Sequence, residues 1–572
     1  MVTFTAPAFI FFDDGRSRYP CLGYEWEDAA GNTGSGATTS FTLDVRRDLT
    51  VTWHWGTLEH FLDVRDGGLC TVSYAAQGDN APGWYDEGMI VRVTCAPADA
   101  DTTFDAWLGD VAIADKAKAS IDITVDRPKV IVATLHRDAA RARSLVWTGE
   151  AGDADWFNKV NWDGLAIPGR YDAVLVTNGA FQARYPAEIE VASLAVTNAT
   201  GFLFCKTNTA TFAQIDAYTT AIDDFDPRPS ALSVAGDFSA GGLARIYCGG
   251  IEQAFRVDVS VGGNATLGGG TKSSNRSRLQ IYAMDMGAWD NLDNYRVGGG
   301  SLTVGGTFAL EGFAQFTPAG CRKSGAVVPV KAARVVIGQN AEINASCRGF
   351  GRSFFNPGTG WRKTLYGYAT SGSNNFGGTY GGQGGYNDTE SFGYIAAPFY
   401  PGSTGNTGAS NTGEIFSGGG AVRIDAHEIV LDGKILANAH GGHTVGGGAG
   451  GGVWLTCNKF SLGGNALIEA RHSDGSSYSG TGGGGGGRIA IGLKFNAARI
   501  ARLYRAGVVT DMAVTPLAEI VAGTDLCARY GIDWTGHFNV DAGMGPGDGR
   551  NGTAGTAVLV EAPSAGTVLI LR

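Results

Sequence analysis

The chain has 572 residues, of which 89 are glycine and only 17% are charged. This glycine content is about twice the usual share and argues against an ordinary helical enzyme, whereas 44% hydrophobic residues are too many for a disordered glycine polymer. The net charge of −11, with no basic block interleaved with aromatic residues, argues against a nucleic-acid partner. We therefore expect a folded, turn-rich, all-β protein.

We do not expect the first residues of the chain to form a signal peptide, because Asp13 and Asp14 interrupt the apolar run that such a peptide needs. No stretch reaches the roughly 18 apolar residues of a membrane-spanning helix, so no transmembrane segment is expected. The chain is then either soluble inside the cell or part of a longer secreted product. Its nine cysteines are widely spaced, without a Cys-x-x-Cys pair, which predicts isolated thiols.

An internal repeat lies within residues 1–140. Residues 41–55 align with residues 121–135 at an offset of 80, and in both copies apolar and polar residues alternate on either side of a short turn. This alternation predicts two half-buried strands in each copy. We expect a truncated module over residues 1–56, which begins in mid-repeat, and a second module over residues 57–140.

Three phrases follow one another in the second module: Gly83-Trp-Tyr-Asp-Glu-Gly88, Phe104-Asp-Ala-Trp-Leu-Gly109 and the strands of residues 121–135. In this order they resemble the bacterial repeat modules of surface proteins, including the Listeria-Bacteroides type. The resemblance implies small β-modules strung in tandem on secreted or wall-bound proteins, where they act as spacers or adhesive units. Trp84 and Tyr85 are then either a packed turn or exposed rings that stack on a glycan.

A tryptophan-rich segment follows over residues 141–187. It contains Trp147-Thr-Gly149, Asp153-Ala-Asp-Trp156, Asn161-Trp162 and Asp172-Ala-Val-Leu-Val176. This series resembles the opening of bacterial surface β-helix and autotransporter-like passenger proteins. Tryptophans among turn-forming residues, ahead of an alternating strand, also suit a cap that shields the open end of a stack of strands.

From residue 188 to residue 572 the chain repeats a short phrase of turn and strand. Glycines of this phrase stand at positions 236, 263 and 306, with offsets of 27 and 43, and at positions 433 and 464, with an offset of 31. The glycines suggest tight corners with positive φ, and the irregular spacing suggests loops of varying length between equivalent strands. The pattern predicts a glycine-rich, right-handed parallel β-helix (solenoid), with one short helix over residues 496–507. In this it resembles the parallel β-helices of the autotransporter-like and pectin-lyase-like kind.

The clearest internal copy places residues 422–439 on residues 453–470, at an offset of 31. A glycine run precedes each copy, and a third run, residues 482–487, precedes the strand that begins at Arg488. Equivalent positions place these runs on one side of the stack, where they either pack backbone against backbone or form exposed loops.

Few residues of the sequence suggest a catalytic, metal-binding or glycan-binding site. Asp223, Asp224 and Asp226 form the densest acidic group, which could hold calcium, serve acid and base catalysis, or simply line a solvated turn. His440, His443 and His472 come together if the coils stack in register, which makes them candidate metal ligands. Trp289 joins Trp84 and Tyr85 as a candidate glycan contact. Asn275-Arg-Ser277 resembles a fragment of a motif in β-helical alginate and chondroitin lyases, although its flanking residues do not match.

These patterns predict an extracellular or cell-surface protein with a structural or adhesive function, without a catalytic site. Its expected partner is a surface or extracellular polysaccharide or a neighbouring surface protein. No cofactor is expected, with bound calcium as the one open alternative. The alternative is a polysaccharide lyase or hydrolase built on the same parallel β-helix, since a fold does not decide a function.

Overall fold

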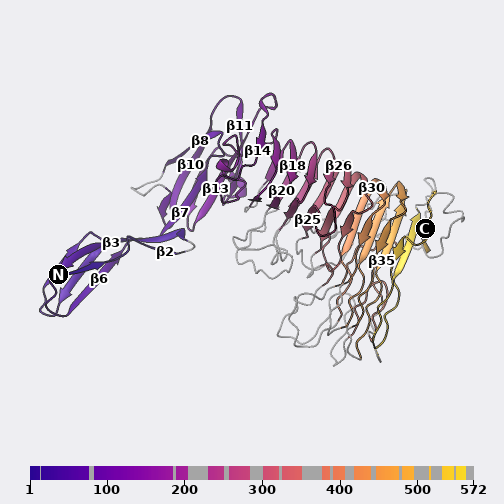
Figure 1. Ribbon diagram of the computed structural model, residues 1–572. Coiled ribbons are helices and arrows are strands. Elements are labelled where there is room, and N and C mark those ends of the chain that lie inside the picture. The colour runs from indigo at the N-terminus through magenta and orange to yellow at the C-terminus, as the bar shows by residue number, and fades with distance from the viewer. Residues whose placement is uncertain are drawn as a thin grey trace, which may run out of the picture. The chain divides into compact units, whose positions relative to one another are not determined.

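The computed structural model describes residues 1–12, 15–75, 83–183, 188–203, 230–249, 257–283, 300–320, 325–350, 376–386, 391–405, 418–439, 446–475, 480–494, 514–516, 531–546 and 549–561. Over these residues the protein is all-β and contains no α-helix (Figure 1). It forms two compact units, residues 1–143 with 157–171 and residues 144–156 with 172–572. The tryptophan-rich segment is therefore divided between the units. The helix expected over residues 496–507 lies in a part that is not described.

The first unit contains a two-stranded, a three-stranded and an eight-stranded sheet, with the orders β1-β5, β12-β10-β8 and β11-β13-β7-β3-β2. In the last of these, β4 and β6 also pair with β3, and β9 pairs with β7. The strands are β1 (Val2–Thr5), β2 (Phe9–Phe12), β3 (Ser17–Asp28), β4 (Thr33–Gly36), β5 (Ser40–Leu43), β6 (Leu49–Trp55), β7 (Glu59–Arg65), β8 (Cys70–Ala75), β9 (Trp84–Asp86), β10 (Met89–Pro97), β11 (Thr102–Gly109), β12 (Ser120–Val125) and β13 (Lys129–Arg137). Single turns of 3-10 helix accompany them, η2 (Ile113–Asp115), η3 (Ala139–Arg141) and η4 (Lys159–Asn161).

The repeat predicted from the sequence recurs in the strand pairing. In the first copy β1 pairs with β5 and β3 with β6, and in the second copy β10 pairs with β12 and β11 with β13, all antiparallel. Phe4 lies opposite Phe41, just as Val93 lies opposite Ile121, the counterpart of Phe41 in the second copy. Both copies thus place the two strands of the repeated segment in different sheets.

The two copies differ in the depth of their cores. In the second copy Val91, Val93, Trp107 and Val125 are fully buried, and the Nε1–H of Trp107 donates to the backbone oxygen of Lys118 at 2.9 Å. The core of the first copy consists of four half-buried rings: Phe4, Phe41 and Tyr24 are stacked, and Trp53 meets Tyr24 edge to face. The first copy is therefore the less complete module.

The second unit contains two long sheets whose neighbouring strands are parallel, apart from one antiparallel pair between β36 and β38. The sixteen-stranded sheet consists of β14 (Ser144–Val146), β15 (Ala173–Val176), β17 (Glu188–Val191), β18 (Ser193–Thr197), β20 (Ser230–Val234), β21 (Phe238–Gly241), β23 (Val257–Val261), β24 (Ala265–Leu267), β26 (Ser301–Leu310), β28 (Pro329–Ile337), β30 (Ala421–Leu431), β32 (Gly452–Cys457), β33 (Lys459–Leu462), β35 (Arg488–Leu493), β36 (Val514–Pro516) and β38 (Thr556–Glu561). The nine-stranded sheet consists of β16 (Ala180–Ala183), β19 (Thr200–Leu203), β22 (Arg245–Cys248), β25 (Arg278–Tyr282), β27 (Gln315–Ala319), β29 (Glu342–Asn344), β31 (Lys434–Leu436), β34 (Leu467–Glu469) and β37 (Phe538–Asn539).

The chain alternates between these two sheets. From β15 it enters the nine-stranded sheet at β16, returns to the sixteen-stranded sheet at β17 and β18, and leaves again at β19; this alternation continues to β35. The buried rings of Phe308 on β26 and Phe316 on β27 meet edge to face with their centroids 5.4 Å apart, so the core lies between the sheets. At the first strand of the nine-stranded sheet, Trp147 and Trp156 pack on Phe181, as a cap would.

The offsets between repeated phrases in the sequence equal the offsets between paired residues of neighbouring strands. Phe238 pairs with Ala265 at the offset of 27, and Ala265 pairs with Phe308 at the offset of 43. Ile429 pairs with Phe460 at the predicted offset of 31. Irregular spacing therefore reflects loops of unequal length between strands that are in register.

The glycines of the recurring phrase do not have the backbone conformation expected from the sequence. Positive φ is absent at all five positions named from the sequence: Gly236, Gly263, Gly306, Gly433 and Gly464. A Cβ on Gly262 would lie 2.2 Å from the backbone oxygen of Ala235, and one on Gly305 would lie 2.3 Å from the oxygen of Gly262. The prediction of positive-φ corners is therefore wrong at the five named positions. Close approach of the preceding turn excludes a side chain at Gly262 and Gly305, whereas Gly464 has open space beside it.

Candidate functional site

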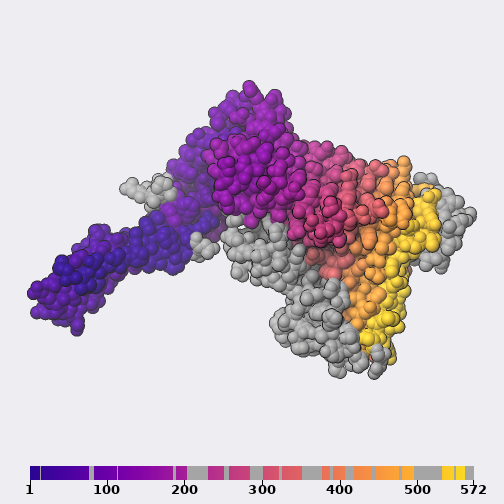
Figure 2. Space-filling model, viewed as in Figure 1, coloured from indigo at the N-terminus to yellow at the C-terminus, as the bar shows by residue number. Residues whose placement is uncertain are grey.

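The glycine runs form a bundle of extended backbone segments beside the sixteen-stranded sheet. Figure 1 shows these segments as long traces below β30 and β35, and in Figure 2 the orange and yellow atoms of this region pack without gaps. The runs are buried, so the prediction that they pack backbone against backbone is confirmed and the exposed-loop alternative is wrong for them. We define the glycine bundle as residues 376–386, 418–420, 446–452, 482–487 and 549–555.

Hydrogen bonds in the centre of the bundle repeat every three residues. The backbone N–H groups of residues 483 and 486 donate to the oxygens of 550 and 553, those of 484 and 487 to the oxygens of 473 and 470, and that of 485 to the oxygen of 378, all at 2.8–3.1 Å. Successive N–H groups therefore point to three different neighbouring segments. Three residues per turn is the repeat of a polyproline II chain, and here glycine lets such chains bond side by side.

The bundle leaves no room for side chains at its contacts. A Cβ on Gly486 would lie 1.9 Å from the backbone oxygen of Val540, and a Cβ on Gly450 would lie 2.0 Å from that of Ala470. Real Cβ contacts are never this short. Close packing therefore requires glycine at these positions, and the bundle is an ordered part of the fold.

A polar cluster lies on the outer face of the nine-stranded sheet. The Oε1 atom of Glu342 accepts hydrogen bonds from the guanidinium of Arg276, from Gln315 Nε2 at 2.6 Å and from Asn344 Nδ2 at 3.1 Å. The side chains of Arg276 and Glu342 are only 16% and 14% exposed. Arg276 belongs to the Asn-Arg-Ser phrase noted in the sequence, and this Glu342 cluster was not foreseen because its members come from different turns of the chain.

Other acidic side chains of the stack hold its turns in place. Asp237 Oδ1 accepts the backbone N–H of Asn264 at 2.7 Å, and Asn264 Oδ1 accepts that of Thr307 at 2.9 Å. Asp432 Oδ1 accepts the N–H of Asn465 at 3.1 Å. These bonds link equivalent turns of neighbouring strands, which is a structural use of Asp and Asn.

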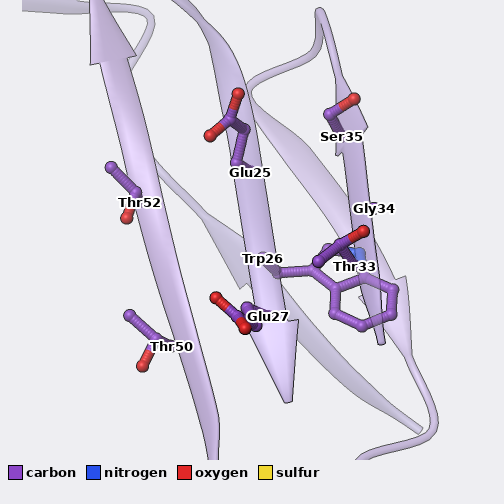
Figure 3. A pocket seen from close by; sticks show the side chains of 8 residues that line it. All are labelled: Glu25, Trp26, Glu27, Thr33, Gly34, Ser35, Thr50 and Thr52. Carbon is purple, nitrogen blue, oxygen red and sulfur yellow. The ribbon is translucent and has the colours of Figure 1, made fainter. Parts of the chain in front are cut away.

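The first module has a polar hollow of about 390 Å³ on one face of strands β4, β3 and β6 (Figure 3). In the figure Thr50 and Thr52 stand on β6 beside Glu25 and Glu27 of β3. The remaining lining residues are Trp26, Thr33, Gly34 and Ser35. His54 Nε2 lies 3.4 Å from Glu25 Oε2, so the open face is acidic with one histidine at its side.

The candidate glycan contacts that can be located are packed. Tyr85 is 7% exposed and belongs to the core of the second module, so its ring has no open face for a sugar. Trp84 is half-buried: the guanidinium of Arg18 lies 4.1 Å from its ring centroid and the ring of Phe61 lies 5.2 Å away. Trp289 falls in a segment that the structure does not describe.

Of the candidate metal ligands, only His472 is in the described part of the chain. Its Nδ1 lies 2.7 Å from the backbone oxygen of Asp541, and its Nε2 lies 3.1 Å from Asp474 Oδ1. The other five, His440, His443, Asp223, Asp224 and Asp226, are not in that part. Within it, no group of three or more His, Cys, Asp or Glu side chains is placed to hold a metal ion.

The six described cysteines are free, but two of them are not isolated. Cys70 on β8 and Cys95 on β10 share a hydrogen bond between their thiols, and this bond together with burial raises the pKa of Cys70. Desolvation raises the pKa of Cys248 and that of Cys457 to about 12 in each case. These latter thiols are therefore neutral, inert parts of the core.

Comparisons of the chain with protein-family models, with curated proteins and with solved structures gave no match. Across the residues whose structure is described, no helix is long and apolar enough to cross a membrane.

Proposed function

We propose that this chain is an extracellular or cell-surface protein with a structural and adhesive function, and that its second unit is a right-handed parallel β-helix acting as a stiff stalk. Alternation between two sheets with parallel neighbours supports the solenoid, and parallel crossover connections are right-handed in almost all proteins. The resemblance of residues 1–140 to bacterial repeat modules supports the surface location.

The observation that carries this proposal is the three-residue repeat of hydrogen bonds in the glycine bundle. A segment bonded to three neighbours resists bending in every direction, and its glycines carry no functional groups for chemistry. Such a bundle stiffens the stalk. The contact surface is then the exposed outer segment of the bundle, which includes Arg550, together with the nearby exposed Met544 and the small modules. The proposed partner is a polysaccharide or a neighbouring surface protein.

Size-exclusion of labelled polysaccharides tests the proposal. Acidic and neutral polymers are incubated with the intact chain, with and without calcium, and the elution of both polymer and protein is followed. We expect every polymer to keep its length and at least one to co-elute with the protein. Shortening of any polymer would overturn the proposal.

The alternative is a polysaccharide lyase or hydrolase on the same scaffold, and the Glu342 cluster is the observation that favours it. A carboxylate beside a guanidinium can act on an acidic sugar, one group as a base and the other as a charge partner. If polymers shorten, Glu342→Gln should abolish the shortening. Glu428→Gln is the matched control, because Glu428 pairs with Arg334 at 2.9 Å on the sixteen-stranded sheet.

A further inference from the structure

The second module has two strands that the first module lacks. In the second module β7 pairs in parallel with β13, and β8 pairs antiparallel with β10. The counterparts of β13 and β10 in the first module are β6 and β1. Among the described residues, β6 pairs with β3 alone and β1 pairs with β5 alone. The first module therefore has an open strand edge at each position where the second module has a partner strand.

The missing strands explain the shallow core of the first module. Ile131 on β13 is fully buried and lies opposite Val64 of β7, whereas Val51, its counterpart on β6, is only partly buried. Trp53, two positions further along β6, is likewise partly buried. A strand added beside β6 would place its own apolar side chains next to these two on the same face of the sheet and so reduce their exposure.

The edge of β6 has backbone groups ready to pair. Between β3 and β6 the N–H of Ala29 donates to the oxygen of Asp48 at 2.9 Å, which makes these two residues a hydrogen-bonded pair. Antiparallel pairs alternate, so Thr50 and Thr52 bond toward β3, and Val51 and Trp53 direct their N–H and C=O groups away from it. An extended segment can bond to these outward groups.

We propose that the outer edge of β6 binds an extended segment of another polypeptide as an added parallel strand, in the way that β13 binds β7. The side chains of that segment alternate, with an apolar residue opposite Val51. Its polar side chains are basic, because they lie on the face that carries Glu25 and Glu27 (Figure 3). Backbone bonds supply affinity in such strand addition, and the alternating side chains supply specificity.

Fluorescence anisotropy of labelled peptides tests this. The probes are a peptide with the sequence of residues 57–66, which contains β7, the same peptide with Glu59→Lys and Asp63→Lys, and a scrambled version of the basic peptide. With the full chain at low salt, we expect the basic peptide to bind at least ~10-fold more tightly than the other two, since charge complementarity is strongest at low salt. Equal binding of the basic peptide and its scrambled version would overturn the proposal.

Two variants separate the strand edge from general attraction to an acidic surface. Val51→Pro removes an outward N–H and should weaken binding of the basic peptide by roughly 10-fold or more, because proline cannot donate to an added strand. Val51→Ala trims the side chain but keeps the N–H, and should weaken binding by less than about 3-fold. Equal affinity for both variants would contradict the proposal.

Hydrogen exchange gives a readout that does not depend on a variant. The amides of Val51 and Trp53 should exchange rapidly in the free chain and at least about 10-fold more slowly with the basic peptide bound. Unchanged exchange at saturating peptide would overturn the proposal. Protection in the free chain that rises with protein concentration would instead identify a second copy as the occupant, which is also contrary to the proposal.

Discussion

Substitution of Gly486 by alanine tests whether the glycine bundle is held together by direct backbone contact. The new Cβ would lie 1.9 Å from the oxygen of Val540 and 2.3 Å from the nitrogen of Gly555. Both neighbours are backbone atoms, so neither can turn away as a side chain would. The segments must separate, and this weakens the bond from Gly486 N–H to the oxygen of Thr553 and that from Gly555 N–H to the oxygen of Val540.

The loss of stability expected for Gly486→Ala follows from these contacts. Forcing a methyl group into a packed site costs about 1–3 kcal/mol, and each of two lost hydrogen bonds adds about 1 kcal/mol. Gly486→Ala should therefore destabilise the bundle by roughly 3–5 kcal/mol. The matched control is Gly464→Ala: Gly464 does not have positive φ and has no atom within 4 Å of its added Cβ. That change should be neutral or stabilise by up to about 1 kcal/mol, through the lower entropy of the unfolded chain.

Hydrogen exchange is the suitable assay, because a long stack of strands need not unfold in one step. The amides of residues 483–487 and 552–555 should lose protection in Gly486→Ala and keep it in Gly464→Ala. Equal protection in both variants would show that backbone contact does not hold the bundle, and the reasoning would be refuted.

Three further predictions concern thiols, acid and the core of the second module. Cys248 and Cys457, with their pKa raised to about 12 by burial, should resist iodoacetamide at pH 8 until urea unfolds the chain, and alkylation at equal rates with and without urea would contradict this. A hydrogen bond from Arg92 lowers the pKa of Asp122 below its ordinary 3.8, so the stabilisation by this pair is present above that value and is lost as the pH falls through the lower folded pKa. An NMR titration of the carboxyl should show the pKa return toward 3.8 in Arg92→Ala, and no change would refute the assignment. Trp107→Ala should lower the free energy of unfolding of the first unit by about 3–5 kcal/mol, as measured by urea denaturation. A decrease of less than about 1 kcal/mol would mean that the core tolerates the cavity and would contradict the prediction.

The strand pattern and the registers could be predicted from the sequence because both are periodic and local. Alternation over residues 41–55 and 121–135 identified the strands, since successive side chains of a strand point to opposite faces. The prediction that they are half-buried is wrong for β13, whose residues 130–133 are buried on both faces. The offset of 31 that pairs Ile429 with Phe460 was readable because equivalent turns of a stack repeat the same apolar positions. The sequence also indicated that the glycine runs lie together on one side.

The partners of these positions depend on segments that lie far apart in the chain. The residues that bond to the run 483–487 come from positions near 378, 470 and 550. Gly263 and Gly306 were expected to form corners, but the sequence did not show that the preceding turn lies too close to each of them for a side chain. The Glu342 cluster likewise joins residues up to 66 positions apart. Local sequence determines that a strand or a glycine run exists, because φ, ψ and side-chain alternation are local. Only the tertiary structure decides which backbone approaches it, because the turns between equivalent positions have unequal lengths.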